Sequence, residues 1–295
     1  MSPAGRSALL RRRLGPARSR GPREPTAPME FPPLEEMLGG VEIRSGHGCF
    51  WEIETPLVLP GASIRIDNAL RSNQLHAKER DELDGGEPLG VEEAVFFDLE
   101  TCGFSGTPLF LVGILVAGGD GSGDDSGAGG GSIRISQFLA RDYSEEAAVV
   151  AAAAARLGRR PLWISFNGRA YDRPFLAERA IRHGLRLPAP RAHLDLLHAA
   201  RRRWRNRLPD CRLGTLEARI LGRPRIGDVP GAEAPERYHR FVRTGDARSL
   251  APVIRHNLMD LTALVELLGT LPETGYGESA GLDKESSARL GFVSG

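Results

Sequence analysis

Residues 94–104 read AVFFDLETCGF, and the interpretation of the whole chain starts from this stretch. Its apolar opening predicts a buried strand, which the glycine at 103 ends. Because successive side chains of a strand point to opposite faces, Asp98 and Glu100 share one side of the extended chain. Two adjacent carboxylates repel each other, and a divalent cation such as Mg²⁺ or Mn²⁺ relieves that repulsion. The alternative at this point is a pair of solvated acids at the end of a strand.

The composition is that of a soluble globular protein, with 41% hydrophobic and 26% charged residues in a chain of 295. No apolar run approaches the length of about twenty residues that a membrane span requires, so we expect none. The three cysteines are widely spaced and contain no C-x-x-C pair. This pattern argues against a disulfide framework or a zinc ribbon and fits a reducing, cytoplasmic location.

Positive charge is concentrated in one part of the chain, although the net charge is only +1. Residues 156–225 contain eighteen arginines and five acidic residues. A basic segment of this density could contact the phosphates of a nucleic acid. The alternative is a compositional bias, because arginine outnumbers lysine by 37 to 2 over the whole chain.

Composition also divides the chain into four regions. Residues 1–33 form a leader rich in arginine and proline that we expect to be disordered. Residues 34–88 contain short β-like runs and a polar linker, residues 89–270 form the main domain, and residues 271–295 form a disordered tail. The arginine-rich start also resembles an organellar transit peptide, but arginine is abundant throughout the chain.

Within the main domain, predicted strands and helices alternate. Apolar runs at 94–101, 109–117 and 133–139 predict three strands in an antiparallel meander. The connection at 118–132 has eight glycines in fifteen positions and predicts a flexible hairpin-like loop rather than a phosphate-binding loop. Further segments predict two short strands, at 161–166 and 193–195, and three helices, at 143–157, 172–183 and 252–268. The result is a mixed α/β sheet flanked by helices.

Two later segments could bring more polar groups to the acidic pair. The segment NGRAYD, residues 167–172, joins a buried strand to a helix, at the strand end where open α/β sheets bind ligands. Asn167 and Asp172 could therefore share one crevice, although Asp172 could instead be an ordinary helix cap. In the helix predicted at 252–268, His256 and Asp260 lie one turn apart on a partly covered side, and a purely structural His–Asp pair is the alternative.

Together these residues match the plan of two-metal phosphoryl hydrolysis, in which about four carboxylates from different elements hold two ions. A histidine can orient or deprotonate the attacking water. The segments FDLET at 97–101, NGRAYD at 167–172 and HNLMD at 256–260 resemble the three exonuclease motifs of the DEDD superfamily, whose fold is ribonuclease H-like. Over residues 40–268 the chain more narrowly resembles the YprB-like RNase H-like family, through further segments at 48–54, 166–174, 193–198, 211–217 and 228–231.

The resemblance implies a 3′–5′ exonuclease with two Mg²⁺ or Mn²⁺ ions on a ribonuclease H-like mixed sheet, preceded by a small β-rich lead-in. It implies that His256 stands beside the attacking water and that Asp98 bridges the ions. In the well-known histidine branch of the superfamily the histidine precedes the last aspartate by five positions, whereas His256 precedes Asp260 by four. The implied metal ligands are Asp98, Glu100, Asp172 and Asp260, and the implied substrate contacts are Thr101, Asn167, Tyr171 and Asn257. For Asn257 the hydrogen bond could go either to the nucleotide or to a ligand.

Asp195 is a secondary candidate, because an aspartate at the start of a helix is more typically a cap.

Two other functions remain open from the sequence. One is a non-catalytic nucleic-acid-binding module, although a pure binder gains nothing from negative charge clustered beside phosphates. The other is a structure-specific endonuclease on the same fold. The sequence leaves open whether the nucleic acid is DNA or RNA, whether a helicase is a partner, and what the oligomeric state is.

Overall fold

The computed structural model describes residues 31–57, 59, 61–71, 89–117 and 133–271. Most of the predicted leader, the later part of the linker, the glycine-rich loop at 118–132 and nearly all of the predicted tail lie outside these residues. None of the described helices combines the length and apolar character needed to cross a lipid bilayer.

The described strands form one seven-stranded mixed sheet with the order β1-β2-β5-β4-β3-β6-β7. As predicted, β3 (Ala94–Thr101), β4 (Leu109–Ala117) and β5 (Ile133–Leu139) make an antiparallel meander. β6 (Leu162–Ser165) pairs in parallel with β3, and β7 (Ala192–Asp195) pairs in parallel with β6. The predicted α/β fold class, with a mixed sheet flanked by helices, is confirmed.

The lead-in belongs to the same sheet. β1 (Val41–Ser45) and β2 (Gly48–Leu57) form an antiparallel pair, and β2 also pairs with β5. The pairing covers the edge of β5 that would otherwise present unpaired backbone groups. Burial of Trp51 and Ile53, which share one face of β2, fixes its register, because a one-residue slip would turn both side chains to the opposite face.

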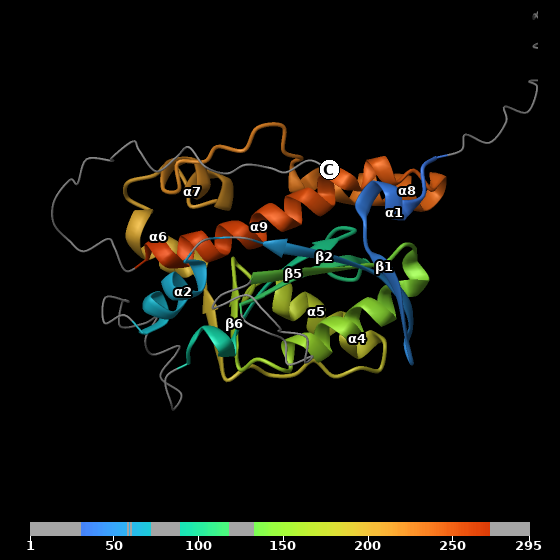
Figure 1. Ribbon diagram of the computed structural model, residues 1–295, viewed down its shortest axis with the longest axis horizontal. Helices are drawn as coiled ribbons and strands as arrows, with labels where there is room; N and C mark the ends of the chain where they lie inside the picture. The colour runs from blue at the N-terminus through green and yellow to red at the C-terminus, as the bar shows by residue number, and fades with distance from the viewer. Residues whose placement is uncertain (1–30, 58, 60, 72–88, 118–132, 272–295) are drawn as a thin grey trace, which may run out of the picture. The chain divides into compact units, whose positions relative to one another are not determined.

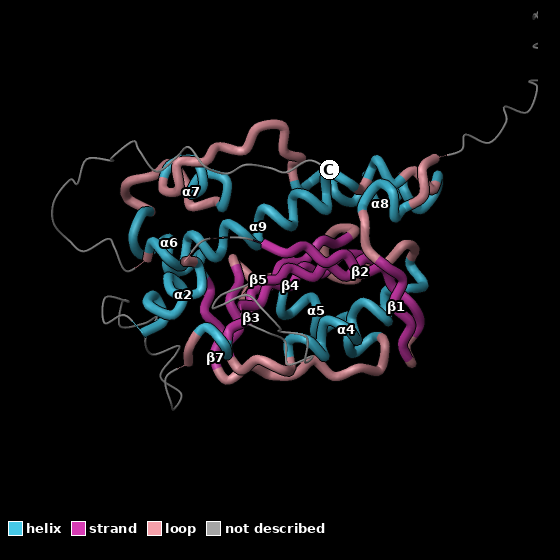
Figure 2. The backbone as a smooth tube through the Cα atoms, in the orientation of Figure 1, coloured by secondary structure: helices cyan, strands magenta, loops and turns pink. Residues whose placement is uncertain are grey.

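Helices cover both faces of the sheet (Figures 1 and 2). On one face, α4 (Glu146–Leu157) contacts β2, β4 and β5, and α5 (Asp172–Arg182) packs beside it. On the other face, α9 (Ala251–Thr270) crosses β3, β4 and β5 and contacts α2, α6 and α7. The other helical segments are α1 (Leu34–Leu38), α2 (Ala62–Arg71), η1 (Val91–Glu93), η2 (Tyr143–Glu145), α6 (Leu196–Trp204), α7 (Leu213–Arg219), η3 (Gly231–Glu233), α8 (Ala234–Thr244) and η4 (Ala247–Ser249).

The alternation of β3 decides which helix the acidic pair meets. Phe97 packs in the core that contains α4, whereas Phe96 packs in the core that contains the later turns of α9, from Leu261 to Leu268. Asp98 and Glu100 continue the Phe96 side, because side chains two residues apart share a face. The acidic pair is therefore directed toward the face of the sheet that α9 covers.

Candidate active site

One row of residues across three strands forms the floor of the candidate site. Asp98 on β3 lies opposite Gly113 on β4, which lies opposite Gln137 on β5. A Cβ atom at position 113 would lie 2.1 Å from Oδ1 of Asn257 on α9. Glycine in this strand therefore permits the close approach of α9. The side chain of Asn257 fills the space above Gly113, between Asp98 and Gln137.

Asn257 holds Asp98 in place. Its Nδ2 donates to Oδ2 of Asp98 at 2.8 Å, and its Oδ1 accepts from Nε2 of Gln137 at 2.8 Å. The side chain is 0% exposed. Of the two partners expected for Asn257, the nucleotide or a ligand, the structure shows a predicted ligand, because a fully buried amide with both polar atoms engaged has no surface for a substrate. Its role in the structure is to orient Asp98.

Asp172 reaches β3 through the space left where β6 ends. The pairing of β6 with β3 stops at Phe96, so the later part of β3 has a free edge on that side. The backbone amides of Asp172 itself and of Leu99 on β3 act to lower the pKa of the Asp172 carboxyl, against the larger effect of burial. Tyr171, not Asp172, is the N-cap of α5. The alternative that Asp172 is an ordinary cap is therefore not observed.

Asp195 shapes the turn that leads into α5. Its Oδ1 accepts from the backbone amides of Asn167, at 2.8 Å, and Leu197, at 3.1 Å. Its Oδ2 accepts from the backbone amide of Arg169 at 3.1 Å. Asn167 has a φ of 64°, a conformation that asparagine tolerates better than most residues. Asp195 thus caps α6 and fixes the turn, which explains its buried position.

The four predicted ligand carboxylates come from β3, α5 and α9 and influence one another. Burial, followed by the charges of Asp260, Asp172 and Glu100, raises the pKa of Asp98 well above its usual range. Burial and then the charges of Asp260 and Asp172 do the same to the pKa of Glu100. The pKa of Asp172 rises to about 7, chiefly through burial. The site concentrates negative charge that a divalent cation would relieve.

The chemistry of this donor set fits Mg²⁺ or Mn²⁺, which prefer carboxylate oxygens. Within the described ranges, no three or more His, Cys, Asp or Glu side chains are arranged around a common point as metal ligands. Asp98 Oδ2 is held by Asn257, and Asp260 Oδ1 is paired with Nη2 of Arg225. Ligation through that oxygen of Asp260 would require Arg225 to release it.

His256 lies between two carboxylates. Its Nδ1 is 3.0 Å from Oδ1 and 2.9 Å from Oδ2 of Asp228, and its Nε2 is 3.6 Å from Oδ2 of Asp260. Asp228 belongs to the DVPG segment at 228–231, to which the sequence analysis assigned no role. The structure therefore adds a partner of His256 that the sequence pattern did not identify.

Arg225 ties this region together. Its Nε lies 2.5 Å from Oε2 of Glu217, its Nη1 lies 2.8 Å from Oδ2 of Asp228, and its Nη2 pairs with Asp260. The arginine side chain is only 11% exposed. Three carboxylates on α7, α9 and the intervening loop thus share one guanidinium, so the group retains excess negative charge.

Thr101 and Tyr171 lie together at the end of β3. Their hydroxyl oxygens are 3.0 Å apart, and both hydroxyls lie within hydrogen-bonding distance of the backbone oxygen of Gly103, at 2.7 Å and 3.0 Å respectively. The structure brings these two predicted substrate contacts together, and their contact with a substrate stays a prediction.

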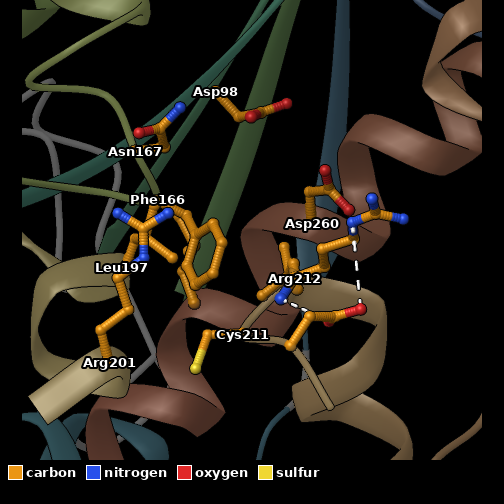
Figure 3. A pocket seen from close by; sticks show the side chains of 11 residues that line it. Asp98, Phe166, Asn167, Leu197, Arg201, Cys211, Arg212 and Asp260 are labelled. Carbon is orange, nitrogen blue, oxygen red and sulfur yellow. Dashed lines mark hydrogen bonds and ion pairs between the residues drawn. The ribbon is translucent and has the colours of Figure 1, made fainter. Parts of the chain in front are cut away.

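A cavity of about 470 Å³ opens beside Asp98 and Asp260 (Figure 3). Its walls come from the turn after β6, from α6, from the segment before and into α7, and from α9. Its volume lies within the range of small-molecule sites. The remaining lining residues are Phe166, Asn167, Leu197, Arg201, Asp210, Cys211, Arg212, Leu213 and Leu264.

With a chelator present, the free energy of unfolding should fall as the pH rises from 3.8, the ordinary pKa of an aspartate, toward about 7, the pKa of Asp172 in the folded protein. In that window the folded protein retains a proton that the unfolded chain has released, so rising pH favours unfolding. The Asp172→Asn variant should show a fall smaller by on the order of 2 kcal/mol. Thermal unfolding across this pH range measures the effect.

The control for this measurement is Glu233→Gln, which changes an exposed carboxylate outside the site and should follow the wild type. A difference between wild type and Asp172→Asn that stays constant with pH would contradict the prediction.

Comparison with known proteins adds three findings. The sequence model of the RNase_H superfamily matches residues 95–271. The uncharacterized protein YprB of Bacillus subtilis (strain 168) is 32% identical over 177 residues, which cover 58% of this chain and 40% of YprB. The family B DNA polymerase of the hyperthermophilic archaeon Pyrobaculum calidifontis matches 64% of this chain and 28% of its own, with 15% identity and a TM-score of 0.45. This chain therefore matches less than half the length of either relative.

Proposed function

Because the chain belongs to the RNase_H superfamily and carries a YprB-like domain, we propose that it is a divalent-metal-dependent nuclease that hydrolyses phosphodiester bonds as a 3′–5′ exonuclease. The observation that carries the proposal is the convergence of four carboxylates from β3, α5 and α9: burial and the neighbouring charges, that of Asp260 among them, raise the pKa of Asp98, Glu100 and Asp172. A buried group of like charges costs stability, and a function that requires the charge explains why it is kept.

Asp98, Glu100, Asp172 and Asp260 would hold two Mg²⁺ or Mn²⁺ ions. When bound, such ions supply charge neutralisation at the phosphate and a hydroxide nucleophile. The chain itself fixes the orientation of one of these ligands, because Nδ2 of Asn257 donates to Oδ2 of Asp98. The guanidinium of Arg225 offsets the charge of Asp260 when that carboxylate has no other cation.

The cavity beside Asp98 and Asp260 would receive the terminal nucleotide. Phe166 supplies an aromatic ring against which a base can stack, and such stacking tolerates any base. Arg201 and Arg212 line the same cavity, are exposed, and can contact phosphates. His256, with Nε2 facing Asp260, stands where it can orient or accept a proton from the attacking water. The polarity of cleavage is taken from the likeness of the three motifs to the DEDD exonucleases.

The test is cleavage by the purified protein of 5′-labelled linear single strands of DNA and of RNA, with Mg²⁺, with Mn²⁺ or with EDTA. We expect progressive shortening of the linear strands with a metal, none with EDTA, and intact closed circles, because an exonuclease needs an end. Glu100→Gln should lower the rate by about 100-fold or more, since it removes one ligand charge. Glu233→Gln, which alters an exposed ion pair elsewhere, should leave the rate unchanged.

Other results of this experiment would support a different function. Cleavage of closed circles would replace the exonuclease with an endonuclease. Metal-independent binding without cleavage of any substrate would favour a non-catalytic binding module. A wild-type protein that is inert on DNA and RNA with both metals would overturn the proposal.

A further inference from the structure

We propose that Asp228 is the positioning residue for His256: its carboxylate accepts the proton on Nδ1 and so directs the unprotonated Nε2 of the neutral imidazole toward Asp260. The kinetic part of this inference rests on the proposed nuclease function, whereas the tautomer of His256 does not. Asp228 lies 28 residues before His256, outside the three motifs that carry the metal ligands.

The first step is the identity of the donor. Both carboxylate oxygens of Asp228 lie within 3.0 Å of Nδ1. An ionised carboxylate only accepts hydrogen bonds, so a ring nitrogen at this distance must carry the hydrogen. In a neutral imidazole one nitrogen donates and the other accepts, and the partner of one therefore decides the state of the other. With Nδ1 protonated, the lone pair is on Nε2.

The second step is the contact between His256 and Arg225. Nη1 of Arg225 lies 3.3 Å from Nδ1 of His256. Both nitrogens lie closer to Oδ2 of Asp228, Nη1 at 2.8 Å and Nδ1 at 2.9 Å. Two donors converging on one acceptor atom must come close to each other. The contact is therefore a consequence of their shared acceptor, since a guanidinium can only donate and cannot make Nδ1 a donor.

The third step is the rigidity of Asp228. Its Oδ1 accepts from the backbone amide of Val229 at 2.9 Å, and Arg225 is itself fixed by Glu217 and Asp260. The side chains of Asp228 and His256 are 15% and 16% exposed. Although burial raises it, hydrogen bonds from Arg225 and His256 hold the pKa of Asp228 below its usual value, which keeps an acceptor opposite Nδ1.

The fourth step is the direction of Nε2. Nε2 lies 3.6 Å from Oδ2 of Asp260, which is too long for a direct hydrogen bond. A lone pair facing a carboxylate at this distance leaves room for a bridging donor, and a water molecule is the donor that nuclease chemistry would require. Asp228 therefore compensates for the position of His256 four residues before Asp260, because it fixes the ring at Nδ1, the nitrogen opposite the one that faces Asp260.

The direct test is the tautomer of His256 in ¹⁵N-histidine-labelled protein with a chelator present, at a pH where the ring is neutral. Two-bond ¹H–¹⁵N correlation spectra should show His256 as the Nδ1–H form, with its signal assigned by its disappearance in His256→Gln. In Asp228→Asn the amide can donate as well as accept, so the population should shift toward the Nε2–H form. An Nε2–H form in the wild type, or an unchanged tautomer in the variant, overturns the inference whether or not the protein cleaves nucleic acid.

The kinetic test uses a double-variant cycle. Asp228→Asn should lower kcat by about 10–100-fold, as loss of a histidine-orienting partner does elsewhere. The KM for an oligonucleotide and the affinity for Mn²⁺ by calorimetry should each stay within about twofold, since Asp228 is not a ligand. In a His256→Gln background, Asp228→Asn should cause no further loss of kcat, because it acts through the ring. Losses that multiply would overturn the positioning role, and Glu233→Gln serves as the matched carboxylate control.

Discussion

Replacement of Asp98 by asparagine should abolish metal-dependent cleavage and, in the same protein, raise the stability of the metal-free fold. Activity should fall by about 10³-fold or more, because a neutral side chain cannot replace the carboxylate proposed to bridge both ions. The free energy of unfolding in the presence of a chelator should increase by about 1–2 kcal/mol. The reason for the gain is that burial and the charges of three neighbouring carboxylates oppose ionisation of Asp98. An asparagine keeps an oxygen that can accept from Asn257.

Thermal unfolding with EDTA and with Mn²⁺ separates the two effects. The wild type should be stabilised by Mn²⁺, since a ligand that binds only the folded state shifts the unfolding equilibrium. Asp98→Asn should start from a higher midpoint and gain little. Glu233→Gln should behave as the wild type in both conditions. An Asp98→Asn protein that is less stable than the wild type without metal would show that the carboxylate is structural.

Replacement of Gly113 by alanine should destabilise the protein by about 2–4 kcal/mol, although alanine is ordinarily the better strand former. A Cβ atom at this position would lie 2.1 Å from Oδ1 and 2.8 Å from Cγ of Asn257, and 2.8 Å from Cδ1 of Leu261. Both contacts are on α9, so the helix must move away from the sheet. Because Asn257 orients Asp98 and Asp260 lies one turn further along, the affinity for Mn²⁺ should fall as well.

Gly214→Ala is the matched control, since no atom lies within 4 Å of a Cβ built there and the residue lies in α7. That substitution should be neutral or stabilising by up to about 1 kcal/mol, through the reduced entropy of the unfolded chain. Chemical denaturation of both variants gives the comparison. Equal stability of Gly113→Ala and Gly214→Ala would mean that the close approach of α9 is not a constraint on the fold.

Local periodicity predicted most elements of the main domain. The strands at 109–117 and 133–139 have the predicted limits, and the helix predicted at 252–268 extends by one or two residues at each end. These segments are long and strongly patterned, so burial of one face determines their type. The helix predicted at 143–157 begins instead with a 3₁₀ turn, η2, capped by Asp142, before α4 starts at Glu146. The limits of the four regions stay predictions.

Partnerships between distant residues were harder to predict. Glycine within the strand at 109–117 was visible in the sequence, but not that Asn257 fills the space above it. Asn257 was expected to bond either the nucleotide or a ligand, and only the structure shows that its partner is Asp98. Arg225 and Asp228 lie in a segment without regular structure, where no periodicity indicates which way a side chain points. Their contacts with Asp260 and His256 depend on how that segment crosses α9.

The sequence by itself determined the common side of Asp98 and Glu100, because that follows from alternation along a single strand. It also determined the mixed α/β architecture and the antiparallel meander, because these follow from the order of strongly patterned segments along the chain. Only the tertiary structure decided that this side faces α9, that Asp172 enters where β6 ends, and that Asp228 holds His256. These features depend on the packing of elements far apart in the chain, and such packing is determined by the burial of all the elements together. Asp98 and Glu100 could be identified from the eleven residues 94–104 alone, whereas the residues that surround them could be identified only from the tertiary structure.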